Sequence, residues 1–266
     1  MSERVITTIE NHVATVTLSR AEKQNALDFD MFKAIAAAGD ALKADRSVRA
    51  VVLRADGDHF CAGMDVSVFQ GGEVDPALLQ KLPDSDANFF QKPAYVWREL
   101  EVPVICAVKG NTLGGGLQIA LGADIRVAAP DAKLSIMEVH WGLIPDLAIT
   151  TTLRDIMPVD KVKALVFSGR ILSGAEALPL GLVTDLSEDP DAAAADLAGV
   201  IARMSPDAIR GGKRLINEAW RMSEAEALRL EADIQARVLM SPNAREAAMA
   251  KFEKREARFA DARDAA

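Results

Sequence analysis

The stretch Asn111-Thr112-Leu113-Gly114-Gly115-Gly116-Leu117 joins two apolar segments, and its glycines decide how the chain can fold there. The segment before it, Val102–Val108, is continuously apolar, as expected of a strand covered on both faces. The segment after it, Leu117–Leu121, predicts a helix. Glycines at such a junction let another group approach the backbone, and a helix N-terminus offers unpaired N–H groups with partial positive charge. The junction therefore favours an oxygen that carries negative charge, and a tightly packed turn is the alternative.

Strand-like and helix-like segments alternate on both sides of this junction over the first two-thirds of the chain. Arg4–Ile9 and Val13–Leu18 predict two strands joined by a turn, and Phe29–Leu42 carries apolar residues at helical spacing. Ala50–Leu53 and Asp124–Ala129 are again short apolar runs. Strand, helix and strand recurring in this order predict an α/β core.

The last third of the chain has a different pattern. From Asp191 onward it shows helical stripes and almost no strand-like segment. Ser223 and Glu226 have the spacing of a capping box, which predicts the start of one of these helices. We therefore expect two parts, a core with the functional site at residues 1–190 and a helical region at residues 191–266.

The overall composition narrows the classes of function. Half of the 266 residues are apolar and 26% are charged, which is the ordinary mix of a globular protein. The net charge of −8 argues against a nucleic-acid surface, which is normally basic. No apolar stretch approaches the roughly 20 residues of a membrane span, and the N-terminus lacks a signal-peptide pattern. We therefore expect a cytoplasmic protein that binds neither nucleic acid nor a membrane.

The cysteines and histidines do not indicate a metal site. Cys61 and Cys106 each lie inside an apolar run, which predicts two buried, reduced thiols rather than a disulfide. His12, His59 and His140 lie far apart in the sequence, without the spacing of metal ligands. No metal is therefore expected.

Two further segments carry groups that could take part in binding or catalysis. Asp56–Asp65 follows a predicted strand, and the small residues Ala62 and Gly63 predict a second close approach to the backbone. Glu138 stands between apolar residues. A carboxylate in such surroundings is desolvated, which raises its pKa toward the range of general acid–base catalysis. The alternative for Glu138 is a buried carboxylate that backbone donors or an arginine satisfy, and Asp146 by itself reads as a turn or helix-cap residue.

Taken in order, these segments resemble the crotonase superfamily, the enoyl-CoA hydratase/isomerase family, over nearly the whole chain. Each motif alone is weak, but their order and spacing together make a chance match improbable. The motifs that carry the resemblance are Leu18–Leu27, Phe60–Asp65, Gly110–Gln118, Ala123–Arg126, Glu138, Gly142–Pro145, Ser168–Arg170, Ala175–Ala177 and Gly181–Val183.

This resemblance implies a fold and a class of reaction. Members of the superfamily fold as an α/β spiral of ββα units, followed by a C-terminal helical region that mediates trimers, commonly stacked as dimers of trimers. They bind an acyl-CoA thioester and stabilise an enolate-like oxyanion on its carbonyl group. The resemblance therefore implies a homotrimer or a dimer of trimers whose substrate is an acyl-CoA. No separate cofactor is expected, because coenzyme A is part of the substrate.

The resemblance also assigns roles to residues of this chain. The two oxyanion-hole donors fall on the backbone N–H groups of Met64 and Gly115, and the catalytic side chains fall on Glu138 and Asp146. The residues expected to bind the substrate are Lys23, Ala26, Ala62, Asp65, Gln118, Trp141, Phe252 and Lys254.

The chain departs from the family pattern at Gln118. Hydratases of this family use two glutamates around one water; the second falls on Glu138, whereas the first falls on Gln118. An amide cannot exchange a proton at neutral pH, so water addition should be impaired. Asp146 lies eight residues after Glu138, where some isomerases and a dehalogenase of the superfamily carry a catalytic aspartate.

These features leave several reactions open. The first expectation is an enoyl-CoA hydratase/isomerase-type enzyme with weakened hydratase chemistry. An enoyl-CoA isomerase that uses Glu138 with Asp146 is one alternative, and a hydrolase or dehalogenase that uses Asp146 is another. A non-catalytic acyl-CoA binder is disfavoured, because the buried Glu138 would then be a costly carboxylate without a purpose.

Overall fold

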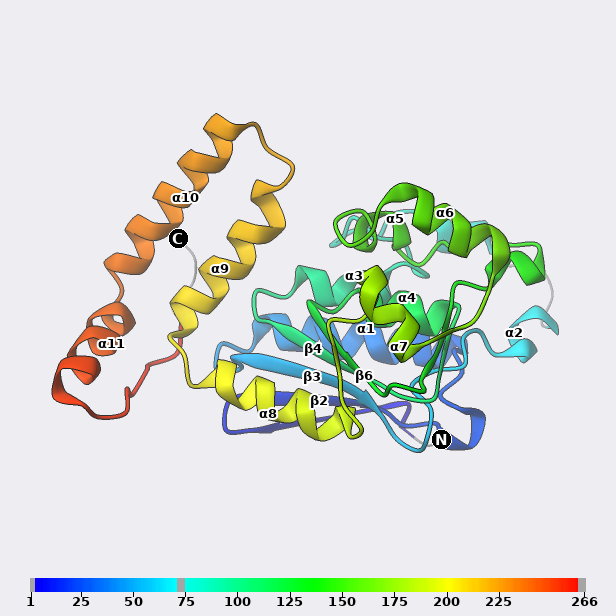
Figure 1. The fold of residues 1–266 in the computed structure, drawn as a ribbon, viewed down its shortest axis with the longest axis horizontal. Helices are drawn as coiled ribbons and strands as arrows, with labels where there is room; N and C mark the ends of the chain where they lie inside the picture. Colours follow the sequence, from blue (N-terminus) through cyan, green and yellow to red (C-terminus); the bar gives the residue numbers. More distant parts are fainter. Residues whose placement is uncertain (1–2, 71–74, 263–266) are drawn as a thin grey trace.

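The computed structural model describes residues 3–70 and 75–262 of the chain (Figure 1). Its strands form two sheets, a larger one of order β1-β2-β3-β4-β6-β9 and a smaller one of order β5-β7-β8. In these described ranges the strands are β1 (Val5–Glu10), β2 (Val13–Leu18), β3 (Ala50–Ala55), β4 (Val104–Val108), β5 (Asn111–Leu113), β6 (Ile125–Ala128), β7 (Lys133–Ser135), β8 (Leu172–Ser173) and β9 (Asp185–Leu186).

The chain moves between the two sheets as it advances, and this gives the fold its spiral form. β4 and β6 pair in the larger sheet, whereas β5 and β7, which follow them directly, pair in the smaller one. Both pairs are parallel. The carboxyl ends of paired parallel strands lie at the same edge of their sheet, so the glycines that follow β5 lie at an edge, next to the segment that follows β7.

The predicted strands lie close to the observed ones. β2 has the predicted bounds, and β1 is shifted by one residue. β3 continues to Ala55, beyond the predicted apolar run. β4 begins at Val104, two residues later than predicted, because Pro103 has no N–H group to give to a sheet.

β3 explains why these runs are continuously apolar. Successive side chains of a strand point to opposite faces of the sheet. Val51 and Leu53 face the main core, whereas Ala50 and Val52 face a second cluster, to which helix α8 contributes Ala194. Both faces of the strand are therefore covered, and neither face can be polar.

Helices cover both faces of the larger sheet, with α1, α3 and α4 on one side and α8 on the other (Figure 1). The helix predicted from Phe29 begins there and continues to Ala44, and the Asp28 side chain caps it by accepting from the Met31 N–H. Within the described residues, no helix combines the length and the apolarity needed to cross a lipid bilayer. The helices there are η1 (Ala21–Lys23), α1 (Phe29–Ala44), α2 (Val66–Gln70), η2 (Pro76–Leu79), α3 (Lys92–Glu99), α4 (Gly115–Leu121), η3 (Glu138–Trp141), α5 (Ile149–Thr152), α6 (Val159–Ser168), α7 (Gly174–Ala177), η4 (Leu178–Leu180), α8 (Pro190–Ala202), α9 (Pro206–Ala219), α10 (Glu224–Leu239) and α11 (Pro242–Glu253).

The last three helices, α9, α10 and α11, form an arm that extends away from the sheets (Figure 1). Lys213 of α9 anchors the arm, because its Nζ donates to Asp124 Oδ2 at 2.7 Å and to the carbonyl oxygens of Trp97 and Val102 at 3.1 and 2.9 Å. The capping box predicted at Ser223 is present at the start of α10 and is thus confirmed.

Candidate active site

Two segments that are far apart in the sequence run side by side at the glycine junction. The Cys61 N–H donates to the Asn111 carbonyl oxygen at 3.0 Å, and the Leu113 N–H donates to the Cys61 carbonyl oxygen at 2.9 Å. A Cβ atom added to Gly63 would lie 2.9 Å from the Leu113 carbonyl oxygen and 3.9 Å from the Gly115 nitrogen. The two close approaches predicted from the sequence therefore belong to one site.

Two backbone N–H groups at this site, those of Met64 and Gly115, have no hydrogen-bond acceptor in the part of the chain that the structure describes. Gly114 has φ 52° and ψ −123°, a conformation that favours glycine. Gly115 then begins α4, so its N–H lies at a helix end with partial positive charge. Two donors on adjacent segments can bind an oxygen atom that gains negative charge.

The glycine junction is closely surrounded by side chains. A Cβ atom on Gly115 would lie 2.9 Å from Leu27 Cδ1 and 3.1 Å from Leu147 Cδ2. A Cβ atom on Gly114 would lie 3.2 Å from Glu138 Oε1. The carboxylate predicted from the third segment is therefore next to the other two segments, although the sequence identified all three separately.

Glu138 is the first residue of η3, and it is half-buried. Its Oε1 accepts a hydrogen bond from Gln118 Nε2 at 2.6 Å, whereas its Oε2 is buried and has no hydrogen-bond partner among the described residues. Burial raises the pKa of the Glu138 carboxyl, and the charge of Asp146 adds to the rise, whereas the backbone N–H of Glu138 itself and the bond from Gln118 oppose it. A carboxylate with a raised pKa and one unpartnered oxygen can take and return a proton near neutral pH.

Asp146 lies close enough for its charge to act on Glu138. The residue is solvent-exposed, but partial desolvation of its carboxyl group raises the pKa of Asp146. The next residue, Leu147, donates its backbone N–H to Gln118 Oε1 at 2.9 Å. The Gln118 side chain, which is fully buried, therefore links Glu138 to the turn that carries Asp146. A contact between Gln118 and the substrate stays a prediction.

Three of the residues predicted to bind the substrate lie on two hydrogen-bonded segments beside Met64. The Ala26 N–H donates to the Lys23 carbonyl oxygen at 3.0 Å, and the Ala62 N–H donates to the Gln24 carbonyl oxygen at 2.9 Å. The Lys23 side chain is exposed, whereas Ala62 is half-buried and Ala26 is buried. A contact of Lys23, Ala26 or Ala62 with the substrate stays a prediction.

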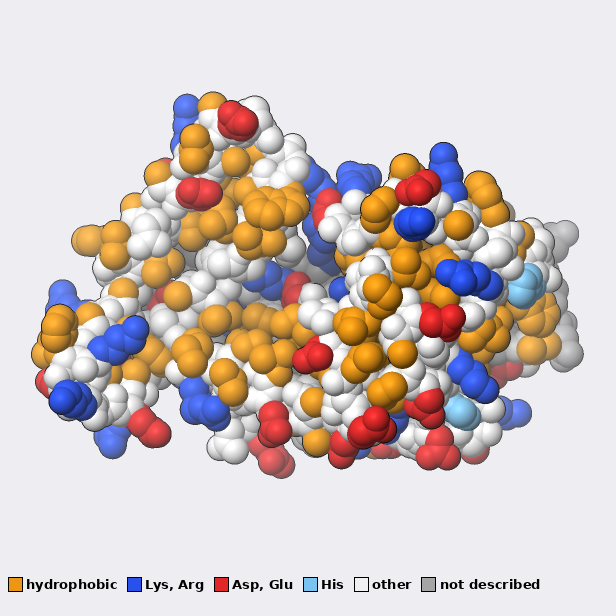
Figure 2. Space-filling view, in the orientation of Figure 1, with side chains coloured by type: hydrophobic (Ala, Val, Ile, Leu, Met, Phe, Trp, Pro, Cys, Tyr) orange, Lys and Arg blue, Asp and Glu red, His pale blue; other side chains and the backbone are white. Residues whose placement is uncertain are grey.

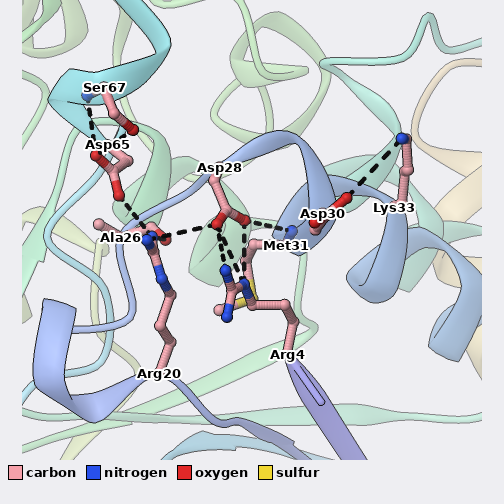
Figure 3. Close-up of polar contacts among 9 residues, drawn as sticks. All are labelled: Arg4, Arg20, Ala26, Asp28, Asp30, Met31, Lys33, Asp65 and Ser67. Carbon is pink, nitrogen blue, oxygen red and sulfur yellow. Dashed lines mark hydrogen bonds and ion pairs between the residues drawn. The ribbon is translucent and has the colours of Figure 1, made fainter. Parts of the chain in front are cut away.

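Asp65, also predicted to bind the substrate, is held within the protein (Figure 3). One carboxylate oxygen accepts from the backbone N–H and the hydroxyl of Ser67, at 2.9 and 2.8 Å, and the other accepts from Arg20 Nη1 at 2.6 Å. The bonds from Ser67, together with the Arg20 guanidinium, lower the pKa of Asp65 to about 2. Asp65 therefore fixes the residue before it, Met64, whereas its contact with the substrate stays a prediction.

Arg20 is a residue of this site that sequence reasoning missed. Its side chain is 10% exposed and donates to the Ala26 carbonyl oxygen at 3.0 Å as well as to Asp65. Its second Nη nitrogen lies 3.5 Å from Asp28, which caps α1 (Figure 3). Arg20 thus ties three segments of the site together. One arginine in a polar turn gives no indication of a partner 45 positions further along the chain.

The two cysteines are buried free thiols, as predicted. Burial raises the pKa of the Cys61 thiol to about 12, and it also raises the pKa of the Cys106 thiol. Because the thiolate is the nucleophilic form of cysteine, neither side chain is suited to covalent chemistry.

Comparison with known proteins decides the family. The sequence model described as enoyl-CoA hydratase/isomerase matches residues 8–262. The chain belongs to this family. The enoyl-CoA hydratase EchA19 of Mycobacterium tuberculosis is 33% identical over 256 residues, which cover 93% of each chain. The mitochondrial methylglutaconyl-CoA hydratase of Mus musculus is 33% identical over 259 residues, which cover 93% of this chain and 79% of that one.

Solved structures of enoyl-CoA hydratases confirm the predicted fold. The crystal structure of an enoyl-CoA hydratase from Mycobacterium tuberculosis H37Rv has a TM-score of 0.86 at 30% identity and covers 97% of this chain and 99% of that chain. The one from Bacillus anthracis has a TM-score of 0.88 at 25% identity, with 96% and 98% covered. This member of the enoyl-CoA hydratase/isomerase family therefore has the expected α/β spiral and C-terminal helices.

Three residues predicted to bind the substrate of this family member have exposed side chains. Trp141 ends η3, close in sequence to Glu138, and is 58% exposed. Phe252 is 84% exposed near the end of α11, and Lys254 caps that helix in the left-handed region. Figure 1 shows α11 at the opposite end of the molecule from α2, the helix that follows Met64. Within one chain, therefore, Phe252 and Lys254 do not join the site, and a role for them requires a second copy.

Proposed function

We propose that this chain is an isomerase-type enzyme that moves a proton on an unsaturated acyl-CoA thioester. Glu138 removes a proton from Cα, and the electron pair passes to the thioester carbonyl, whose oxygen becomes an enolate oxygen. The N–H groups of Met64 and Gly115 hold that oxygen, and each such donor stabilises the transition state by about 3 kcal/mol. The proton returns at Cγ, so the double bond moves from the 3-position to the 2-position and no atom is gained or lost.

The observation that carries this proposal is the position of Glu138 beside the two unpaired N–H groups. Oε1 of Glu138 would lie 3.2 Å from a Cβ atom on Gly114, the residue that precedes the Gly115 donor. In a thioester, the carbonyl oxygen and Cα are only two bonds apart. A base and a pair of oxyanion donors at this spacing can therefore act on the same ligand.

Gln118 favours proton relocation over water addition. Hydration needs one group to activate the water and another to deliver a proton to carbon, and a neutral amide performs neither task. Isomerisation needs only one base that returns the proton it has taken, and Glu138 Oε2 supplies it. Asp146, whose pKa is raised by desolvation, assists because it lies close enough for its charge to act on that base.

The coenzyme A portion of the substrate would lie on the surface that Lys23, Ala26 and Ala62 form. The exposed Lys23 ammonium suits the phosphate groups of coenzyme A, and the small side chain of the half-buried Ala62 leaves room for the ligand beside it. All the proposed chemistry uses the substrate and the chain's own groups, so we propose no separate cofactor.

Hydration is the second candidate function. It is favoured by the names of the relatives, since both EchA19 and the mouse mitochondrial protein are called hydratases. In this case Glu138 would act alone on the water, and the rate would be lower by about 10²–10⁴-fold than with two carboxylates.

Product analysis in deuterium oxide tests the proposal and separates the two candidates. We expect 3-enoyl-CoA thioesters to yield 2-enoyl-CoA in which the hydrogen taken from Cα is found at Cγ, with deuterium there only to the extent that the protonated Glu138 exchanges with solvent before it returns the proton. We expect 2-enoyl-CoA thioesters to yield little 3-hydroxyacyl-CoA. Short, medium and aromatic acyl chains should be compared, so that the same experiment identifies the preferred acyl group. Rapid hydration of 2-enoyl-CoA without double-bond migration would replace the isomerase proposal with the hydratase one.

We further propose that the chain assembles as a trimer or a dimer of trimers through its arm. Figure 2 shows apolar side chains gathered over α9 and α10, and Trp220, Leu228 and Met240 there are 67%, 64% and 87% exposed. A groove of about 940 Å³ between the arm and α3 is lined largely by charged residues. Exposed apolar side chains gathered on one surface are typical of an interface, and charged residues beside them are typical of its rim. Light scattering should give three or six times 28.5 kDa, and a particle of 28.5 kDa would contradict the assembly.

A further inference from the structure

The Gln118 side chain uses both ends of its amide within the protein. Its Nε2 donates to Glu138 Oε1 at 2.6 Å, and its Oε1 accepts from the Leu147 backbone N–H at 2.9 Å. A backbone N–H can only donate, so the atom that faces Leu147 has to be the amide oxygen, and the amide nitrogen then faces Glu138. The orientation of the side chain is fixed by its partners.

A carboxylate at this position could not make the same pair of bonds with an ionised Glu138. It would accept from the Leu147 N–H, but two ionised carboxylates repel each other, and a bond between them requires a shared proton. The amide NH₂ group can donate to an ionised carboxylate because the amide itself does not ionise at neutral pH. An amide at position 118 can therefore hydrogen-bond to an ionised base at position 138, which an ionised carboxylate at position 118 could not do.

The same amide fixes two turns relative to each other. Leu147 is 4% exposed, and Ala148 after it has φ 59°, so the chain turns sharply just beyond Asp146. The buried Gln118 side chain reaches this turn from α4 and reaches η3 with its other end. One side chain thus bridges the Asp146–Leu147 turn and Glu138.

We propose that Gln118 is a positioning residue that ties the Glu138 carboxylate to the Asp146–Leu147 turn, so that Glu138 Oε2 alone carries the proton. The inference rests on the proposed role of Glu138 as the base. Occupation of Oε1 by Gln118 leaves Oε2 as the one oxygen of Glu138 without a hydrogen-bond partner in the described structure. The ionisable group whose charge acts on Glu138 is Asp146, and Gln118 itself is neutral.

The test compares Gln118→Met, which removes both hydrogen bonds at similar length, with Gln118→Glu, which keeps the acceptor for Leu147 and loses the donor to Glu138. Both variants lose a bond that favours the ionised form of Glu138, so the acidic limb of the kcat/KM profile should move to higher pH in both. We expect kcat to fall by about 10–10²-fold, the range for one hydrogen bond to a charged group, with KM unchanged. If the Gln118→Met protein does not fold, the shift of the acidic limb can still be measured with Gln118→Glu.

A double variant distinguishes positioning from a separate contribution. If Gln118 acts through Glu138, adding Gln118→Met to Glu138→Gln should cause no further loss of kcat. An additive loss in the double variant, or an acidic limb that stays at the wild-type pH in both single variants, would overturn the proposal.

A measurement without turnover keeps this inference separate from the proposed function. In protein labelled with ¹³C-glutamate, the infrared carboxylate band that disappears in Glu138→Gln belongs to Glu138, and its titration reports the pKa of that group. We expect this titration to move to higher pH in Gln118→Met even if no enoyl-CoA is turned over. An unshifted titration would contradict the positioning role, whereas a shifted one together with an inactive wild-type enzyme would contradict only the isomerase proposal.

Discussion

Replacing Glu138 by glutamine is expected to lower kcat for double-bond migration by about 10³-fold, within the range for a positioned acid–base group. Glutamine keeps the size of the side chain and can still accept from Gln118, so the packing against α4 is preserved. It cannot take a proton from Cα at any pH of the assay. Steady-state kinetics with the best 3-enoyl-CoA substrate would measure the loss.

The same variant should be at least as stable as the wild type, and this separates a lost base from a damaged fold. The pKa of Glu138 is raised in the folded chain, mainly by burial. The folded state therefore binds this proton more tightly than the unfolded state, in which the pKa is about 4.3. Ionisation of Glu138 therefore lowers the free energy of unfolding as the pH rises from about 4.3 through the pKa of Glu138 in the folded chain. The free energy of unfolding stays lower at all higher pH values.

Glutamine at position 138 removes that ionisation. The Tm of Glu138→Gln should accordingly match the wild type near pH 4 and equal or exceed it at pH 8. The dissociation constant for coenzyme A should be unchanged, because the proposed coenzyme A surface lies at Lys23, Ala26 and Ala62. Wild-type turnover by a correctly folded Glu138→Gln protein would remove Glu138 from the mechanism.

The sequence predicted those parts of the site that depend on local pattern. Glycines after an apolar strand indicate a close approach to the backbone wherever they occur, so both Gly63 and Gly115 could be identified from their neighbours alone. A carboxylate among apolar residues indicates a raised pKa in the same way, as Glu138 shows. The order of the motifs then implied the spiral fold that brings these three segments together.

The sequence did not predict the contacts that depend on side chains meeting across the fold. Gln118 reads locally as one polar residue on an apolar helix, and its partners lie 20 and 29 positions away. Arg20 is one arginine in a polar stretch that indicates no partner, but its side chain is buried between Asp65 and Asp28. Hydrogen bonds of this kind are determined by how three segments pack, and periodicity or composition carries no information about that packing.

The local sequence pattern also does not show which active site the predicted substrate contacts at the end of the last helix would serve. Phe252 and Lys254 could be assigned from the resemblance, but no pattern in one chain tells whether a residue serves its own site or that of a neighbouring copy. In this chain they lie at the far end of the arm (Figure 1). Their role as substrate contacts stays a prediction that depends on the proposed assembly.

Replacing Gly63 by alanine is expected to lower kcat by about 10²–10³-fold, the loss measured when one oxyanion donor is removed. Gly63 has φ 91°, and a Cβ atom there would lie 2.9 Å from the Leu113 carbonyl oxygen. The added methyl group has to push the Met64 segment away from the Gly115 segment, so the two N–H groups no longer reach one oxygen. The measurement is kcat and KM with the same 3-enoyl-CoA, and kcat should carry the change because the donors act on the charged transition state.

The chain offers a closely matched control for this variant in Gly181→Ala. Gly181 has φ 80°, and a Cβ atom there would lie 3.0 Å from the Ile156 carbonyl oxygen, so the backbone strain and the close contact are nearly the same. It lies outside the three segments of the site, at the end of η4. Both variants should lose stability by about 1 kcal/mol or more, since alanine is disfavoured at positive φ. Because the two changes strain the backbone to a similar degree, only Gly63→Ala should lose kcat per folded molecule. A similar loss in both would mean that general destabilisation, and not the oxyanion hole, explains the effect.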